Sequence, residues 1–526
     1  MVAVTDQHEH EHDARPADAR TQPADDAPSA EVGATAASPG TRGGRGRAGA
    51  LGATLRRHPR ATLVTAGALV VALLGTGAVA AGAASAPGAP VAGPAEPGAA
   101  PTVEVTTTPT AVPTADPARS VPGAVPAPTR LRTCSVAAAA ADARLGQFEG
   151  SVVDASTGEV LFDRSGSTPA RTGSVLKTLT SAVALATLGP DARLTTRVTG
   201  DAASGAVALV GGGDATLSAG GPSVYPGAPT LGDLAGQVKA SLGAQPVTSI
   251  TLDATFWDPA DKWHPSWKRS EQTIGYHSEV TALMVDGDRA QPSAQTSPRS
   301  TDPVGRAGEA FRRALVDAGV AGAASAPMSQ GRAGSTTVLG QVQSQPVSSL
   351  VATLLPTSDN TLAEVLARAS SKAAGQDGSA ASLTGVYRSV LSSTYGLDAS
   401  TSTIVDGSGL SEQNAVPSTT VARFMVQVGA RERGLGVVWD ALPVSGRSGT
   451  LASRFTGANA AARGAVHAKT GWIDTAYTLA GTIDAKDGTR LTFAFYAIGN
   501  VQDSARAALD TLTTAVWTCG DDLTST

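Results

Sequence analysis

The sequence predicts a mixed α/β (α+β) fold, in which helices flank an antiparallel sheet and a large inserted region interrupts the chain. The first observation is the order of signals from residue 131 onward, which runs helix, hairpin, helices, hairpin and helix. That order is typical of an antiparallel sheet covered by helices. The second observation is a change of texture between residues 190 and 345, where Gly, Pro and Ser punctuate short apolar strands. This stretch is long enough for one or two small domains.

Local signals place the individual elements. The run Ser156-Thr157-Gly158 is typical of a hairpin turn, and Gly189-Pro190 is typical of a helix stop. In chain order, the expected elements are a helix over 135–145, a hairpin of strands 150–154 and 159–163, a helix over 174–188, strands 206–210 and 247–252, helices over 305–318 and 361–374, strands 477–484 and 490–499, and a final helix over 502–517.

The N-terminal quarter of the chain is not globular. Residues 1–60 have the composition of a disordered tail, and the uncharged stretch 61–86 is long enough to cross ~30 Å of hydrocarbon as a helix. Arginines stay on the cytoplasmic side, so the six that precede this stretch predict a single-pass membrane anchor with the bulk of the chain outside. The alternative is a cleaved signal peptide and a secreted protein, because Ala84-Ser85-Ala86 resembles a cleavage site. Residues 87–130, rich in Pro, Ala and Thr, predict an extended linker.

The remaining chain divides into a catalytic domain, formed by 131–189 and 346–526, and the inserted region 190–345. Its two cysteines, Cys134 and Cys519, lie near the ends of this part and belong to no metal-binding motif, so no metal or cofactor is expected. Export favours a disulfide between them, and two unpaired buried thiols are the alternative. The net charge of -5 argues against a nucleic-acid partner.

Ser174 and Lys177 carry the first chemical signal. They stand three residues apart at the start of a predicted helix, so both project from one face. A serine hydroxyl needs a base before it can attack a carbonyl, and a lysine of lowered pKa can serve as that base. The helix is too apolar to lie on the surface, which predicts a semi-buried Lys177. An incidental Ser–Lys pair is the plain alternative.

Two further motifs follow in the chain. Ser358-Asp359-Asn360 supplies a second hydroxyl and an amide, although these residues are also ordinary helix N-caps. Lys469-Thr470-Gly471 lies on a predicted strand and offers positive charge, a hydroxyl and room for a substrate beside the backbone. An exposed edge-strand lysine is the alternative here. Each motif is weak alone, but the three occur in a specific order, and no other of the seven lysines follows a serine at this spacing.

In this combination the chain resembles the penicillin-binding serine acyltransferases with a beta-lactamase/transpeptidase-like fold. It resembles most the class C low-molecular-mass penicillin-binding proteins, which are D-alanyl-D-alanine carboxypeptidase/endopeptidases. The second motif lies 184 residues after Ser174, which leaves room for the large insert of that class. Further similar segments are 209–217, 276–286 and 406–411. The resemblance covers about residues 131–520.

The resemblance implies roles for the catalytic side chains. Ser174 would attack the carbonyl between the two terminal D-alanines of a peptidoglycan stem peptide and form an acyl-enzyme. Lys177 would accept the serine proton, and Ser358 would help pass a proton to the leaving D-alanine. The same serine would be acylated by beta-lactams, which would act as covalent inhibitors.

The resemblance also implies a set of binding groups. Asn360 would hold the acyl side of the substrate, and Lys469 and Thr470 would bind its terminal carboxylate. Gly471 would give the substrate access to the strand. The backbone N–H of Trp472 would form an oxyanion hole with that of Ser174.

Three rival interpretations stay open. The first is a non-catalytic binding protein on the same fold, and the second is a beta-lactamase or esterase of the same superfamily. The third is a Ser-His-Asp hydrolase using His264, His277 or His467, although no G-x-S-x-G motif occurs.

Overall fold

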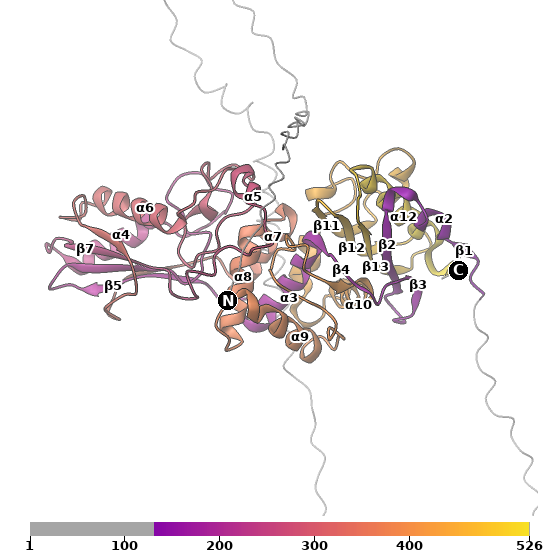
Figure 1. Ribbon diagram of the computed structural model, residues 1–526, viewed down its shortest axis with the longest axis horizontal. Coiled ribbons are helices and arrows are strands. Elements are labelled where there is room, and N and C mark those ends of the chain that lie inside the picture. The colour runs from indigo at the N-terminus through magenta and orange to yellow at the C-terminus, as the bar shows by residue number, and fades with distance from the viewer. Residues whose placement is uncertain (1–130, 525–526) are drawn as a thin grey trace, which may run out of the picture. The chain divides into compact units, whose positions relative to one another are not determined.

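The computed structural model describes residues 131–524 (Figure 1). The predicted tail (1–60), membrane anchor (61–86) and linker (87–130) lie outside the described residues. Between residues 131 and 524, the structure contains no helix with the length and apolarity needed to cross a bilayer.

An antiparallel sheet forms the centre of the C-terminal part. Its strands β11 (Val466–Ile473), β12 (Ala476–Asp484) and β13 (Arg490–Ile498) pair in that order, and the hairpin of β2 (Gln147–Asp154) and β3 (Val160–Arg164) lies beside β13 (Figure 1). Nearly every residue of the middle strands is buried, because helices cover both faces of the sheet.

Side-chain alternation along the strands divides the core into two layers. On one face, Leu479 and Phe493 pack with α12 (Ser504–Cys519) and α2 (Ala137–Ala140). On the other face, Ala480 and Ala494 belong to the core that includes α10 (Ser418–Gly429). Successive residues of a strand point to opposite faces, so one hydrophobic run supplies both layers. The predicted antiparallel sheet flanked by helices is confirmed.

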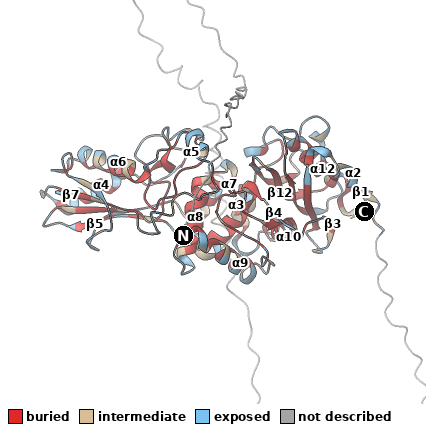
Figure 2. Ribbon diagram, viewed as in Figure 1, coloured by how far each residue is buried: buried red, intermediate tan, exposed pale blue. Residues whose placement is uncertain are grey.

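A group of helices surrounds α3 (Leu176–Thr187), which follows a 3-10 turn over Gly173–Val175. Its neighbours are α7 (Val347–Thr357), α8 (Asn360–Ala373), α9 (Leu383–Ser393) and α11 (Gly436–Ala441). The residues from Leu176 to Leu185 are all buried, as the red core of Figure 2 shows. This burial on every side explains why the helix has no polar face, and its buried hydroxyls bond to backbone carbonyls instead of water.

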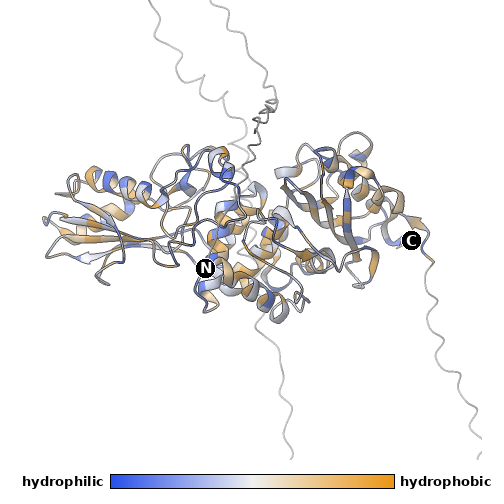
Figure 3. Ribbon diagram, in the orientation of Figure 1, coloured by the Kyte–Doolittle hydropathy of each residue, from blue (hydrophilic) through white to orange (hydrophobic). Residues whose placement is uncertain are grey.

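The region between α3 and α7 builds a second sheet. Its order is β8 (Met328–Gln330), β7 (Ser249–Asp253), β6 (Ala206–Val210), β5 (Thr195–Asp201) and β9 (Val338–Gln343), with both parallel and antiparallel pairs. Helices α4 (Leu231–Leu242) and α6 (Pro303–Asp317) share a separate hydrophobic core with this sheet. Hydrophobic and hydrophilic residues alternate along α6, as expected of a helix with one buried face (Figure 3).

The segment between β7 and α6 leaves this sheet and packs on the helices around α3. It contains the short helix α5 (Ser270–Ile274), and its side chains Trp257, Trp267 and Met284 belong to the same core as α3. A part of the inserted region therefore reaches the neighbourhood of the predicted catalytic residues.

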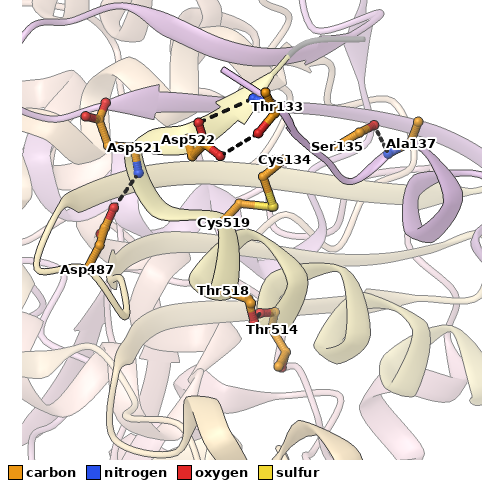
Figure 4. Close-up of a disulfide and its surroundings, with 10 residues drawn as sticks. All are labelled: Thr133, Cys134, Ser135, Ala137, Asp487, Thr514, Thr518, Cys519, Asp521 and Asp522. Carbon is orange, nitrogen blue, oxygen red and sulfur yellow. Dashed lines mark hydrogen bonds between the residues drawn. A yellow bond between two sulfur atoms is a disulfide. The ribbon is translucent and has the colours of Figure 1, made fainter. Parts of the chain in front are cut away.

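The two ends of the described chain are tied together (Figure 4). Cys134 and Cys519 form a disulfide, and β1 (Cys134–Ser135) pairs with β14 (Leu523–Thr524). The expected helix over 135–145 is wrong in extent, since only α2 and a 3-10 turn over Ala143–Leu145 form there. The reason is local: the Asp142 side chain accepts from the N–H of Arg144 and begins a new turn instead of continuing the helix.

Candidate active site

Ser174 and Lys177 meet at the start of α3. The Lys177 ammonium is fully buried and donates three hydrogen bonds of 2.7 Å, to Ser174 Oγ, Asn360 Oδ1 and the carbonyl oxygen of Ser408. The 3-10 turn that precedes α3 leaves Ser174 partly exposed while Lys177 lies below it. The arrangement gives the serine hydroxyl a basic partner that water does not reach.

Burial sets the protonation of Lys177. Desolvation lowers the pKa of Lys177 to about 8, against the opposing effect of the carboxylates of Asp406, Glu364 and Asp359. An amine of this pKa is partly neutral near pH 7, so it can accept a proton from a hydroxyl.

A second serine and lysine form the opposite side of the site. Lys469 on β11 is fully buried and donates to Ser358 Oγ at 2.8 Å and to the carbonyl oxygen of Thr470 at 2.8 Å. Burial, and then the charge of Lys177, hold the pKa of Lys469 well below its usual value. Ser358 lies between α7 and α8 with a left-handed backbone, at φ 55.

The N-cap alternative for the second motif also holds. Asp359 is the N-cap of α8, where its side chain accepts from the N–H of Leu362. Capping fixes the start of the helix and so places Asn360 in its first turn. The Asn360 amide then bridges two segments, since Oδ1 accepts from Lys177 and Nδ2 donates to the carbonyl of Tyr276 at 3.2 Å.

Gly471 brings β11 against the turn that carries Ser174. A Cβ at Gly471 would lie 2.8 Å from Ser174 N, and a Cβ at Gly173 would lie 3.1 Å from Trp472 N. Only glycine permits this close approach of the backbone of β11 to the turn that carries Ser174. The Trp472 side chain is 45% exposed. Beside it on β11, Thr470 Oγ1 lies 2.7 Å from the hydroxyl of Thr450.

Sequence reasoning missed several residues that hold the site. Ser408 supplies a carbonyl to Lys177, and the carboxylate of Glu364 accepts from the N–H groups of Gly407 and Ser408 at 2.8–3.0 Å. The glycine-rich segment 406–411 was singled out as similar to a family segment, yet nothing in it indicated a backbone contact. Glu364 had a signal that could have been used, because it lies four residues after Asn360 on the same face of α8.

None of the three candidate histidines hydrogen-bonds Ser174 in the described residues. His277 packs against Trp267 with ring centroids 4.4 Å apart, His467 stacks on Trp439 at 4.4 Å, and His264 lies within hydrogen-bond distance of a neighbouring serine. The basic side chain that hydrogen-bonds the nucleophile candidate is the lysine of the first motif. The geometry therefore favours a serine hydrolase of the penicillin-binding class over a Ser-His-Asp hydrolase.

Comparison with known proteins agrees with this class. The D-Ala-D-Ala carboxypeptidase 3 (S13) family matches residues 132–300 and 293–516. Carboxypeptidase DacB of Mycolicibacterium smegmatis is 37% identical over 413 residues, which cover 76% of this chain and 88% of that protein. Carboxypeptidase Rv3627c of Mycobacterium tuberculosis is 34% identical over 397 residues, covering 74% of this chain and 84% of that protein.

A solved structure shares the fold. The crystal structure of penicillin binding protein 4 (dacB) from Haemophilus influenzae aligns with a TM-score of 0.60 at 18% identity, and the alignment covers 73% of this chain and 98% of that chain. The chain belongs to the D-Ala-D-Ala carboxypeptidase 3 (S13) family. It is a serine-type carboxypeptidase of the class C low-molecular-mass penicillin-binding type, as the three motifs predicted.

Proposed function

We propose that this protein removes the terminal D-alanine from peptidoglycan stem peptides through an acyl-enzyme on Ser174. The observation that carries the proposal is the position of Lys177, a buried amine 2.7 Å from Ser174 Oγ. A buried lysine costs free energy unless its contacts compensate, so this placement indicates a chemical role.

The acylation step follows from the contacts around Lys177. Its neutral form accepts the proton of the Ser174 hydroxyl, and Oγ attacks the carbonyl carbon of the penultimate D-alanine. The oxyanion that forms accepts hydrogen bonds from the backbone N–H groups of Ser174 and Trp472. Removing one such donor costs ~10²–10³ in rate in other enzymes.

The leaving group departs on the other side of the site. Ser358 Oγ accepts a hydrogen bond from Lys469, so its own proton is free to pass to the departing amine nitrogen. The C–N bond breaks, D-alanine leaves, and Lys469 with Lys177 restores the proton to Ser358. Water then attacks the ester carbonyl, and Ser174 regains its proton as the acyl group is released.

Substrate binding falls to the groups beside these side chains. Asn360 holds the acyl side of the peptide, while Thr470 and Lys469 bind the terminal carboxylate, whose charge favours the protonated form of Lys469. Gly471 leaves the edge of β11 open to the peptide backbone. A beta-lactam carries a carbonyl and a carboxylate in a similar relation, so it acylates the same serine.

Labelling with fluorescent penicillin and D-alanine release from a pentapeptide ending in D-Ala-D-Ala test the proposal together. Ser174→Ala should abolish both, because no hydroxyl remains to form the ester. Ser181→Ala is a matched control on the same helix, since its hydroxyl bonds only the carbonyl of Lys177. If the Ser174→Ala variant is labelled as strongly as the wild type, the assignment of the nucleophile is overturned. If the wild type itself is not labelled, the result favours a non-catalytic binding protein.

The same acyl-enzyme could cut crosslinks as well as terminal residues. We propose that the chain is also an endopeptidase, because both substrates present the same D-alanyl carbonyl to Ser174. Digestion of crosslinked and uncrosslinked muropeptides side by side measures the two activities. Release of D-alanine without loss of crosslinked dimers would restrict the function to carboxypeptidase action.

We also propose that residues 61–86 anchor the protein in the cell membrane with the catalytic domain outside. The arginines that precede this uncharged stretch and the linker that follows it support the proposal. Membrane fractionation of the full chain and of a chain lacking residues 1–86 tests it. If the full chain is expressed and the protein recovered from the medium begins near Ala86, the N-terminal segment is cleaved and the protein is secreted.

A further inference from the structure

Asp359, the middle residue of the second motif, is bound by two side chains from the inserted region. Its Oδ2 accepts from Arg289 Nη2 at 2.7 Å and from the Tyr225 hydroxyl at 2.8 Å. Arg289 Nη1 in turn donates to the Tyr225 hydroxyl at 2.7 Å, which closes a triangle of three buried side chains. The remaining oxygen of Asp359 caps α8 through Leu362. These three hydrogen bonds fix the position of the Asp359 carboxylate.

The charge on Asp359 depends on this triangle. Burial alone would raise the pKa of Asp359, but the guanidinium groups of Arg289 and Arg299 outweigh it and hold the pKa below its usual range. The side chains of Arg289 and Asp359 are 1% and 2% exposed, so water does not compete for the pair. An ion pair this deeply buried is held in one geometry by the hydrogen bonds that satisfy it.

Ser358, the residue before Asp359, has a backbone that serine rarely adopts. Its φ is 55, in the left-handed region where a Cβ crowds the following carbonyl. Such a conformation persists only where the surrounding structure holds it, and it recurs at functional sites. Here it directs Ser358 Oγ to Lys469 Nζ, while the next residue is fixed by the Arg289 contact.

Arg289 is itself positioned by a tight left-handed turn. Asp286, Gly287 and Asp288 all have positive φ, and a Cβ at Gly287 would lie 2.5 Å from Arg289 Nη1 and from the Tyr225 hydroxyl. Arg306 donates to the carbonyl of Arg289 at 2.9 Å and to the carboxylate of Asp288 at 2.7 Å. The Arg289 guanidinium also donates to the carbonyl oxygens of Asp286 and Gln295 at 3.4 Å, so contacts within the inserted region hold both its backbone and its side chain.

We infer that Arg289 and Tyr225 are positioning residues that hold Ser358 in its left-handed conformation through Asp359. The inserted region thus serves the reaction directly, since it fixes the hydroxyl that passes a proton to the leaving group. The inference rests on the role proposed above for Ser358. If the triangle opens, the backbone at Ser358 relaxes toward the right-handed region and its hydroxyl leaves Lys469. A displacement of about 1 Å in a reacting group can cost ~10²-fold in rate.

The test compares acylation rates and thermal unfolding in the full chain. Arg289→Lys keeps the charge but loses the two-pronged contact with Asp359 and Tyr225, and it should slow acylation by fluorescent penicillin ~10–100-fold. Tyr225→Phe removes one hydroxyl at nearly constant volume and should slow acylation ~3–10-fold. Arg454→Lys is the control, because Arg454 forms a largely buried ion pair with Asp510, with side chains 13% and 8% exposed, and makes no contact with Ser358 or Asp359. That control should lower the melting temperature and leave acylation within about twofold of wild type.

A double-mutant cycle separates positioning from general stability. In a Ser358→Ala background, Arg289→Lys should slow the residual acylation by less than ~3-fold, since the hydroxyl it positions is gone. The inference is overturned if Arg289→Lys slows acylation by the same factor in the wild-type and Ser358→Ala backgrounds. It is also overturned if folded Arg289→Lys and Tyr225→Phe proteins are acylated at the wild-type rate. If fluorescent penicillin still labels the wild type and not Ser174→Ala, the proposed function stands even when the positioning role of Arg289 fails. The two failures are therefore distinguishable.

Discussion

Asn360→Asp should move the pH dependence of acylation, because it places a carboxylate directly on the base. Asn360 Oδ1 accepts from Lys177 Nζ at 2.7 Å in a buried site, and Asp differs from Asn only in the charged oxygen. A negative charge this close favours the protonated lysine and raises its pKa by ~1–3 units.

The size of the effect follows from the pKa of Lys177, which is about 8 in the wild type. The wild-type rate should rise with pH through about 8, because the base acts in its neutral form, and about one tenth of the lysine is neutral at pH 7. In Asn360→Asp that fraction falls by ~10–10³-fold at pH 7, and the rise moves to pH ~9–11. The deficit should shrink as the pH approaches 10.

Acylation by fluorescent penicillin, measured from pH 6 to 10, gives the profile. Asn360→Ala is the matched control, because it removes the same contact without adding a charge and should lower the rate by a similar factor at every pH. A profile for Asn360→Asp that runs parallel to that of Asn360→Ala would refute the assignment of Lys177 as the neutral base.

Three other predictions follow from single contacts. Gly471→Ala places a Cβ 2.8 Å from Ser174 N and should slow acylation ~10²-fold, whereas Gly236→Ala, where nothing lies within 4 Å, should leave penicillin labelling unchanged. Burial raises the pKa of Glu364 from its usual 4.5 to about 7. The unfolding free energy of the wild type relative to Glu364→Gln should therefore be greatest below pH 4.5 and fall by ~1–3 kcal/mol as the pH rises through 7. Urea unfolding at pH 4.5 and 8 measures this difference, and equal differences at both pH values would contradict the prediction. Replacing Cys134 and Cys519 by serine opens a loop of 385 residues and should lower the unfolding free energy by ~5 kcal/mol in urea titrations, with unchanged penicillin acylation of the folded fraction.

The sequence alone predicted those features that depend on neighbouring residues. The hairpin of β2 and β3, the strands β12 and β13 and the helix α12 follow from periodicity and turn residues, and the structure places them within a few residues of the predicted bounds. The spacing of Ser174 and Lys177 predicted both side chains on one face, and the 2.7 Å hydrogen bond between them confirms it. The one local error, the helix over 135–145, came from a capping aspartate within an alanine-rich run.

Only the tertiary structure decided how the three motifs form one site. Lys177 meets Asn360 across 183 residues and Ser408 across 231, and such contacts depend on how whole elements pack rather than on local pattern. The lowered pKa of Lys177 likewise comes from burial, which no spacing of residues reveals. The inserted region appeared in the sequence as a gap between motifs, whereas in the structure its Arg289 holds the middle residue of the second motif. The sequence determined which chemical groups are present, and packing determined which of them touch, because desolvation and hydrogen-bond geometry act across the folded chain.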